Sequence, residues 1–303
     1  MPELPEVETI KRQLQKEITG KKITGVEVLT EKTLRTPKAR FVKGVVGAKI
    51  KSVERRAKLL ILNLSNGNSI LTHLKMTGQY VLRMTHDTNS TAQHLSFPRA
   101  KGFPSGQRRE SSHAPYGTVN KHTRVIFSFG PKLKIMFNDM RRFGYVKLVK
   151  TAVLAKFLAS EYGPEPLEKN FTLAKFGEIL KRRPNMKIKQ LLMEQKLIAG
   201  VGNIYAQEAC FMSGVLPTRQ TKSLKPVEII KLYDNFRKVM NEAIKYGGTS
   251  AENYLNLYGK EGDFVKRLKV YGRGKEKCRR CGSILKTIKL SGRGTVFCEI
   301  CQK

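Results

Sequence analysis

Four cysteines near the end of the chain have the spacing of a metal site. Cys278 and Cys281 form one CxxC pair, Cys298 and Cys301 form a second, and sixteen residues separate the two pairs. Each pair lets two thiolates hold one face of a zinc ion, and two pairs complete a closed tetrahedron. This pattern favours one structural zinc ion over free thiols or a redox pair. Since four thiolates leave no open position for a substrate, we expect no catalytic role for the metal.

A second group that could do chemistry stands at the amino terminus. Pro2 and Glu3 precede a segment whose apolar residues, from Val7 onward, are spaced for one buried helix face. If Met1 is removed, Pro2 presents a secondary amine that is partly unprotonated near neutral pH, and this amine can attack a sugar C1′ to form an iminium. The carboxyl group of Glu3 could then protonate the sugar ring oxygen. A proline in second position is common, so this interpretation depends on the rest of the chain.

The charge of the chain indicates a polyanionic partner. The 303 residues include 58 Lys and Arg against 24 Asp and Glu, which gives a net charge of +34. A one-sided charge of this size favours nucleic acid first and an anionic membrane surface second, and composition alone does not separate DNA from RNA. Apolar runs are short, as at 59–62, whereas a membrane span needs about 20 apolar residues. We therefore expect no membrane span, no export signal and a cytoplasmic location.

The first half of the chain predicts an antiparallel β-sandwich or barrel. Short segments rich in β-branched and aliphatic residues are separated by chain breakers such as Asn66-Gly67-Asn68. Residues 85–121 interrupt this pattern and predict a long, mobile, polar loop whose three histidines, His86, His94 and His113, are solvated. The expected strands cover residues 22–29, 45–53, 59–64, 69–74, 80–84, 123–129, 133–137 and 145–149.

The second half of the chain predicts helices and then a small metal-dependent tail. Helical patterns cover residues 152–161, 172–182, 187–196, 203–213 and 226–246, and Gly-Pro-Glu-Pro at 163–166 marks a hinge. The expected fold is therefore α+β and multidomain. It comprises an N-terminal helix with a β-sandwich over 1–150, a helical domain over 151–259 and a zinc ribbon over 260–303. No internal repeat is present, and we expect a monomer.

Two further segments are suited to binding a nucleic-acid backbone. The glycines of Ala199-Gly-Val-Gly-Asn203 permit close approach to the start of a helix, whose free N–H groups suit a phosphate. Arg293, between two glycines, is expected at a hairpin tip, where it could reach a phosphate or a base edge. Each of these signals is weak alone and gains weight within a basic, zinc-containing chain.

Taken together, these segments resemble the formamidopyrimidine-DNA glycosylase family of bifunctional base-excision repair enzymes. The start of the chain is similar to the branch that removes oxidised purines, because the branch for oxidised pyrimidines typically begins with PEGPE. The resemblance implies a helix-two-turn-helix in the helical domain. It is carried by PELPEVET at 2–9, RRAKLLIL at 55–62, HLKMTG at 73–78, NDMRRFG at 138–144, GPEPL at 163–167, GVGNIYAQE at 200–208 and VYGRG with the cysteines from 270.

The resemblance also implies a catalytic role for particular residues. Pro2 would be the nucleophile that displaces the damaged base and forms the Schiff base for strand cleavage, and Glu3 would be the general acid. Glu6 would help to hold the everted lesion and its sugar. Lys58 would donate a proton during β-elimination, and Arg293 would do so during δ-elimination. From the residues alone, Lys58 could equally be an outward-facing strand lysine.

DNA contacts follow from the same resemblance. Met76, Arg141 and Phe143 match the three residues that fill the gap left by a flipped base, with the arginine paired to the orphaned cytosine. The expected DNA-backbone contacts are His122, Asn185 and Asn203. In this chain Met140 stands where the family has proline, which suggests a looser turn before Arg141, and Lys75 is an unusual neighbour of Met76.

We expect an active glycosylase and abasic-site lyase. Its partner would be double-stranded DNA that contains oxidised bases, such as 8-oxoguanine or formamidopyrimidine opposite cytosine, or abasic sites, and it would be associated with the nucleoid. Two alternatives remain at this stage. One is a glycosylase for oxidised pyrimidines, and the other is a non-catalytic DNA-binding protein, which the charge alone would support equally well.

Overall fold

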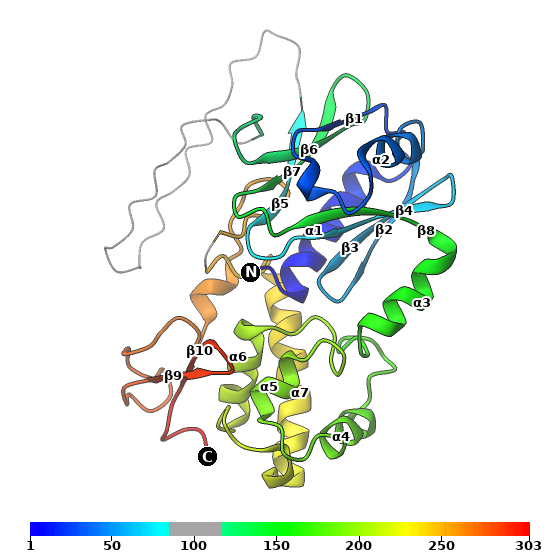
Figure 1. Ribbon diagram of the computed structural model, residues 1–303. Helices are drawn as coiled ribbons and strands as arrows, with labels where there is room; N and C mark the ends of the chain where they lie inside the picture. Colours follow the sequence, from blue (N-terminus) through cyan, green and yellow to red (C-terminus); the bar gives the residue numbers. More distant parts are fainter. Residues whose placement is uncertain (85–116, 252) are drawn as a thin grey trace.

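The amino-terminal part of the chain folds into two antiparallel sheets that face each other across a shared core (Figure 1). The computed structural model describes residues 1–84, 117–251 and 253–303, so most of the polar segment expected at 85–121 and its three histidines lie outside the described residues. One sheet has the order β1-β6-β7-β5 and the other has the order β2-β3-β4-β8. The strands are β1 (Gly25–Val28), β2 (Ile50–Arg56), β3 (Leu59–Leu64), β4 (Asn68–His73), β5 (Gly78–Met84), β6 (Thr123–Ser128), β7 (Leu133–Asp139) and β8 (Tyr145–Lys150).

Helix α1 (Leu4–Ile18) links this core to the helical part of the chain. Its residues Val7, Ile10 and Leu14 are buried in the core of the sandwich, as their spacing predicts. Leu4, one turn earlier, instead belongs to the core of the helical part. The amino terminus consequently lies at the junction of the two parts (Figure 1).

The prediction of a strand over 45–53 is wrong for its first residues. Residues Lys38–Val45 form helix α2, and β2 begins only at Ile50. The reason is that Phe41 and Val45, four residues apart, bury the same helix face, with the Phe41 ring 6.3 Å from that of Phe127. The two β-branched residues at 45–46 favour a strand by local pattern, and the packing of this helix face overrides that preference. The short 3₁₀ helix η1 (Glu31–Thr33) precedes α2.

The second part of the chain is mainly helical. Helices α4 to α7 share one core, in which Phe171, Phe176 and Phe236 lie with ring centroids 5.4–6.3 Å apart. Helix α3 differs, because its Leu154 packs on the outer face of the β2-β3-β4-β8 sheet. The bounds are α3 (Thr151–Glu161), α4 (Leu173–Lys181), α5 (Ile188–Met193), α6 (Asn203–Ser213), η2 (Thr221–Ser223) and α7 (Pro226–Lys245).

After α7 the chain returns to the sandwich before it forms the carboxyl-terminal hairpin. Tyr254 and Leu257 are buried in the sandwich core, and the carbonyl oxygen of Leu257 accepts a hydrogen bond of 3.0 Å from the backbone nitrogen of Leu82. The segment η3 (Phe264–Arg267) leads to the antiparallel pair β9 (Lys286–Leu290) and β10 (Arg293–Phe297), which contacts α6. Among the described helices, none combines the length and apolar character needed to cross a membrane.

Candidate active site and zinc site

The carboxylate of Glu3 lies at the amino-terminal end of α6. Its two oxygens accept hydrogen bonds from the backbone nitrogens of Ile204 (2.9 Å) and Tyr205 (3.4 Å), and the side chain is almost fully buried. A helix start favours a negative charge, because its first N–H groups lack partners within the helix. The sequence pattern predicts that a phosphate uses the N–H groups of this helix start. That expectation is corrected for these two residues, since the protein's own carboxylate binds them.

The two glycines before α6 make room for the amino-terminal segment. A Cβ atom at Gly200, whose φ is +82°, would lie 2.7 Å from the Leu4 side chain. A Cβ atom at Gly202 would lie 2.3 Å from Cδ of Glu3 and 2.7 Å from Nζ of Lys58. Both glycines therefore permit a close approach, and Gly202 shows that the Glu3 and Lys58 side-chain ends converge on one point. Pro2 is buried next to Glu3.

Lys58 lies in the turn between β2 and β3, and its side chain is only 6% exposed. Burial lowers the pKa of its ammonium group below the usual range, while the carboxylates of Glu3 and Glu6 oppose this shift. The positive charge of Arg293 lowers the pKa further. The interpretation of Lys58 as an outward-facing strand residue is thereby excluded.

The turn that carries Lys58 is anchored to the segment between α3 and α4. The carboxylate of Glu165 accepts hydrogen bonds from the backbone nitrogen of Ala57 and, at 2.8 Å, from the Arg55 guanidinium. Arg55 also donates to Glu8 of α1 at 2.9 Å. Ala57 has a φ of +52°, a left-handed conformation that is unusual for a residue other than glycine. These contacts hold the turn in that conformation and thereby fix the position of Lys58.

Glu6 is buried one helical turn after Glu3. Its carboxylate accepts hydrogen bonds from the Tyr205 hydroxyl and from the backbone nitrogen of Thr249 (2.8 Å), and from that of Glu3 (2.8 Å). Burial and the neighbouring Glu3 carboxylate raise the pKa of Glu6 to about 7. The Glu6 side chain therefore links α1, to which it belongs, to α6 and to the segment after α7 by hydrogen bonds.

Met76, Arg141 and Phe143 lie on two neighbouring loops that connect the two sheets. Met76 is half-buried in the β4–β5 turn, whereas Arg141 and Phe143 project from the β7–β8 loop and are exposed. The Arg141 guanidinium lies 4.9 Å from the centre of the Phe143 ring. The loops are joined where Thr77 donates a hydrogen bond of 2.5 Å to the Asp139 carboxylate. The predicted trio is therefore brought together.

Asp139 organises the β7–β8 loop despite the absence of proline at position 140. Its carboxylate oxygens accept hydrogen bonds from the backbone nitrogens of Arg141 (3.2 Å) and Gly144 (2.7 Å). Its own backbone nitrogen donates to the carbonyl oxygen of His122 at 2.8 Å, which places His122 beside this loop. The concern that Met140 leaves the turn loose is not supported by this hydrogen-bonding pattern.

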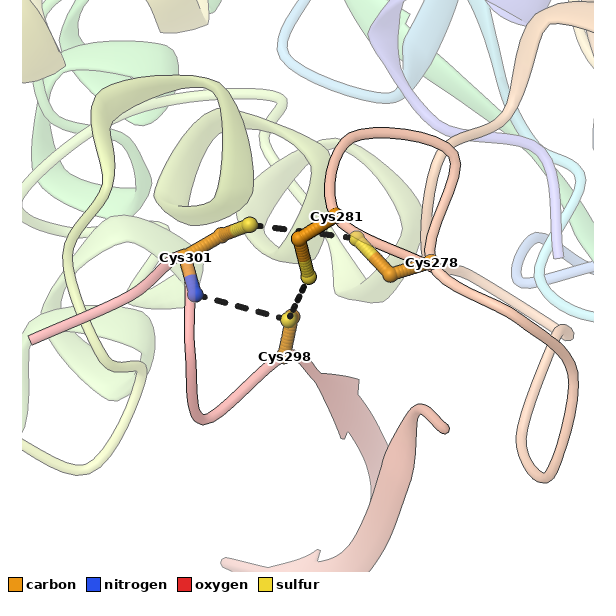
Figure 2. A group of neighbouring side chains, drawn as sticks. All are labelled: Cys278, Cys281, Cys298 and Cys301. Carbon is orange, nitrogen blue, oxygen red and sulfur yellow. Dashed lines mark hydrogen bonds between the residues drawn. The ribbon is translucent and has the colours of Figure 1, made fainter. Parts of the chain in front are cut away.

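The four cysteines predicted as ligands form a zinc site (Figure 2). Their sulfur atoms all lie within 4.8 Å of one another, with Cys278 and Cys301 3.9 Å apart and Cys281 and Cys298 3.5 Å apart. Tetrahedral Zn–S bonds of about 2.3 Å require sulfur atoms about 3.8 Å apart, so the donors fit one structural zinc ion. The backbone nitrogen of Cys301 also donates to the Cys298 sulfur.

Arg293 is the first residue of β10 and is exposed, rather than the tip of the hairpin as expected. The tip is Ser291-Gly292, whose positive φ values of 49° and 75° are those of a two-residue hairpin turn. Asn203 holds this hairpin against α6, because its side-chain amide donates to the carbonyl oxygen of Gly294 at 3.3 Å. Arg293 and Asn203 therefore lie near each other.

Comparison with known proteins identifies the family. The model for the formamidopyrimidine-DNA glycosylase N-terminal domain matches residues 1–146, that for the family's H2TH domain matches 162–254, and that for the zinc finger found in FPG and IleRS matches 275–303. The formamidopyrimidine-DNA glycosylase of Desulfitobacterium hafniense (strain DSM 10664 / DCB-2) is 40% identical over 311 residues, covering 100% of both chains. The chain belongs to the formamidopyrimidine-DNA glycosylase family.

Solved structures of this family agree with the fold. Lactococcus lactis Fpg in complex with DNA that contains an abasic site has a TM-score of 0.83 and 34% identity, over 99% of each chain. The wild-type L. lactis protein in complex with N7-benzyl-Fapy-dG-containing DNA has a TM-score of 0.82 and 34% identity, over 100% of each chain. The expected α+β fold, with an antiparallel sandwich, a helical part and a zinc ribbon, is confirmed.

Sequence reasoning missed Lys189, a buried residue near the zinc-bearing hairpin. Its ammonium donates a hydrogen bond of 2.6 Å to the hydroxyl of Thr295 on β10, and burial lowers its pKa to about 8. Position 189 in the short helix α5 carries no local signal, because its hydrogen-bond partner lies more than a hundred residues later. Asn185, which was predicted to contact DNA, is exposed in the turn before α5.

Proposed function

We propose that this chain excises oxidised purines from duplex DNA and then cleaves the strand at the resulting abasic site. The observation that carries the proposal is the convergence of Glu3 and Lys58 over Gly202, directly beside Pro2. One buried acid, one buried amine and an amino-terminal proline are the groups that amine-based excision needs. Family membership adds weight to this assignment.

In the proposed reaction the Pro2 nitrogen, freed by removal of Met1, attacks C1′ of the damaged nucleotide. The C1′–N bond to the base breaks, and the base leaves with the bonding electrons and takes up the proton that the attacking Pro2 nitrogen releases. Glu3 protonates O4′, the C1′–O4′ bond opens, and the nitrogen lone pair forms the iminium. Loss of a C2′ proton then expels the 3′ phosphate, and a second elimination expels the 5′ phosphate. Lys58 and Arg293 transfer protons in these two steps.

The exposed trio supports recognition of a flipped-out lesion. We propose that Met76 and Phe143 enter the gap in the duplex and that Arg141 hydrogen-bonds the orphaned cytosine, which offsets an unstacking cost of a few kcal/mol. His122, Asn185 and Asn203 would contact phosphates, and Glu6 would help to hold the lesion. The DNA contacts made by the family member from L. lactis are consistent with such a partner.

The zinc site has a scaffolding role in this proposal. Cys278, Cys281, Cys298 and Cys301 would hold the ion, which supplies rigidity to the hairpin that presents Arg293. We further propose that the chain acts as a monomer in the cytoplasm, on nucleoid DNA, and that its functional divisions are residues 1–150, 151–259 and 260–303.

Borohydride trapping tests the proposal. A duplex with 8-oxoguanine opposite cytosine should give a covalent adduct with protein whose amino terminus is verified as Pro2. Pro2→Gly should lose most of the adduct while duplex binding persists. No adduct with the verified wild type would support a non-catalytic DNA-binding protein instead. Faster turnover on a thymine-glycol duplex would support the oxidised-pyrimidine alternative.

A further inference from the structure

Arg124 occupies an irregular position in the sheet that carries the DNA-facing loops. The antiparallel pairing of β6 with β7 shifts register between Thr123, which faces Asn138, and Val125, which faces Phe137. Arg124 is therefore the extra residue of a β-bulge. Bulges redirect a side chain away from the regular alternation of a strand, and they are enriched next to functional sites.

The redirected guanidinium of Arg124 forms hydrogen bonds at the start of the β7–β8 loop. Its Nε and one terminal nitrogen donate to the carbonyl oxygen of Asp139 at 2.9 and 2.8 Å. The other terminal nitrogen donates to the carbonyl oxygen of Lys121 at 3.1 Å and approaches the Thr30 hydroxyl at 3.5 Å. The residue is only 4% exposed, and its two bonds to the Asp139 carbonyl oxygen are buried.

A buried guanidinium that hydrogen-bonds neutral oxygens is costly unless those bonds are retained. Arg124 donates to the main-chain carbonyl oxygen of Asp139. The carboxylate of the same residue accepts hydrogen bonds from the backbone nitrogens of Arg141 and Gly144. Asp139 is thus restrained on both its main-chain and side-chain oxygens. The peptide that follows, which leads into Met140 and Arg141, has its orientation set by these two restraints.

We propose that Arg124 is a positioning residue, which orients the β7–β8 loop so that Arg141 and Phe143 meet the duplex in the correct geometry. This inference rests on the proposed function, because it gives Arg141 the task of pairing with the orphaned cytosine. Arg124 itself touches no substrate. It acts through its hydrogen bonds to the Asp139 carbonyl oxygen. These bonds restrain the loop next to position 140, where this chain has methionine and not the proline that would itself stiffen the backbone.

The test compares opposite-base discrimination in Arg124→Met, Arg124→Lys and the wild type. The measured quantity is a ratio of two single-turnover rate constants: that for excision of 8-oxoguanine opposite cytosine, divided by that for excision opposite adenine. We expect this ratio to fall about tenfold in both variants, because a small displacement of a recognition group has large effects on rate. Lys134→Met, which removes an outward-facing charge from β7, is the matched control and should leave the ratio unchanged.

A double-mutant cycle separates positioning from general destabilisation. In an Arg141→Ala background, Arg124→Met should change the ratio by less than about twofold, because the group it positions is absent. An undiminished, additive effect would overturn the proposal, as would equal losses opposite cytosine and adenine. If Arg124→Met fails to fold by circular dichroism, Arg124→Lys alone decides the result by the same measurements.

A second readout is independent of catalysis. A duplex with a stable abasic-site analogue and 2-aminopurine opposite it reports insertion of the loop through fluorescence on binding. Arg124→Met should lower this signal at saturating protein, and an unchanged signal would overturn the proposal. Failure of the wild type to excise 8-oxoguanine would instead contradict the proposed function, which this binding signal does not require.

Discussion

Glu3 and Ile204, two hundred and one residues apart in the chain, are joined by a hydrogen bond of 2.9 Å from the Ile204 backbone nitrogen to the Glu3 carboxylate. The proposed acid of the reaction is therefore oriented by a helix of the other structural part. The site is complete only when α1 and α6 are in contact, so its geometry depends on how the sandwich and the helical part are placed relative to each other.

Glu3→Gln should separate acid catalysis from binding. Glutamine keeps a carbonyl oxygen for the N–H groups of α6 but has no proton to give, so excision of 8-oxoguanine should fall at least about 100-fold. Affinity for the duplex should change little. Single-turnover excision and a binding titration check this, and excision near the wild-type rate would remove Glu3 from the acid role.

Gly202→Ala should disable the site without a change of charge. Its Cβ atom would lie 2.3 Å from Cδ of Glu3 and 2.7 Å from Nζ of Lys58, so both groups must move. We expect a loss of excision of about 100-fold. Gly177→Ala is the matched control, because outside the adjoining residues and backbone of helix α4 no atom lies within 4 Å of the added Cβ. Equal activity in the two variants would contradict the convergence of Glu3 and Lys58 at this point.

Glu6 should make the free energy of unfolding depend on pH. Its folded pKa of about 7 exceeds the ordinary value of 4.5, so the folded state keeps a proton that the unfolded state releases. This stabilisation is complete below pH 4.5 and is lost as the pH rises through 7. Relative to Glu6→Gln, the wild type should lose about 2 kcal/mol between pH 5.5 and 8. The chain has no tryptophan, so urea unfolding is followed by circular dichroism. Parallel pH profiles in the two proteins would contradict the prediction.

Removal of zinc should affect DNA binding more than the sandwich. Cys298→Ser, or a chelator, breaks the tetrahedron and frees the hairpin that carries Arg293, so affinity for the duplex should be abolished. The β-sheet signal in circular dichroism should persist, because the zinc site lies in a separate small apolar cluster. Cys210→Ser offers a cysteine control outside the site. Retained affinity after verified zinc loss would contradict the scaffold role.

The zinc ligands and the helix at the amino terminus could be predicted from local patterns. The CxxC spacing fixes four ligands directly, and Val7, Ile10 and Leu14 follow a helical period. The position of Lys58 could not be predicted this way, because the groups that set it are distant in the chain: the Glu3 carboxylate lies near its ammonium, and Glu165 binds the backbone of the preceding residue, Ala57. The same holds for Arg124, whose direction depends on a bulge that no local pattern signals.

The glycine turn before α6 shows how a correct pattern can be assigned the wrong partner. The sequence indicated that Gly200 and Gly202 admit a close approach to the helix start, and the structure agrees. The incoming group is the amino-terminal segment, with Glu3 in place of the expected phosphate. Only the three-dimensional arrangement identifies a partner at this sequence separation.

The return of the chain to the sandwich after α7 sets the order of events during synthesis. Leu257 donates its backbone N–H to the Gln13 side chain at 2.9 Å, and the Tyr258 hydroxyl donates to Glu17 at 2.8 Å, so the later turns of α1 are covered by residues that follow them by 244 and 241 positions. A ribosome must complete most of the chain before these contacts can form. The Glu3 carboxylate likewise finds its partner, the backbone nitrogen of Ile204, only 201 residues later, so the amino-terminal segment lacks this cover until α6 has been synthesised. The removal of Met1 that the proposed function requires has this interval available to it.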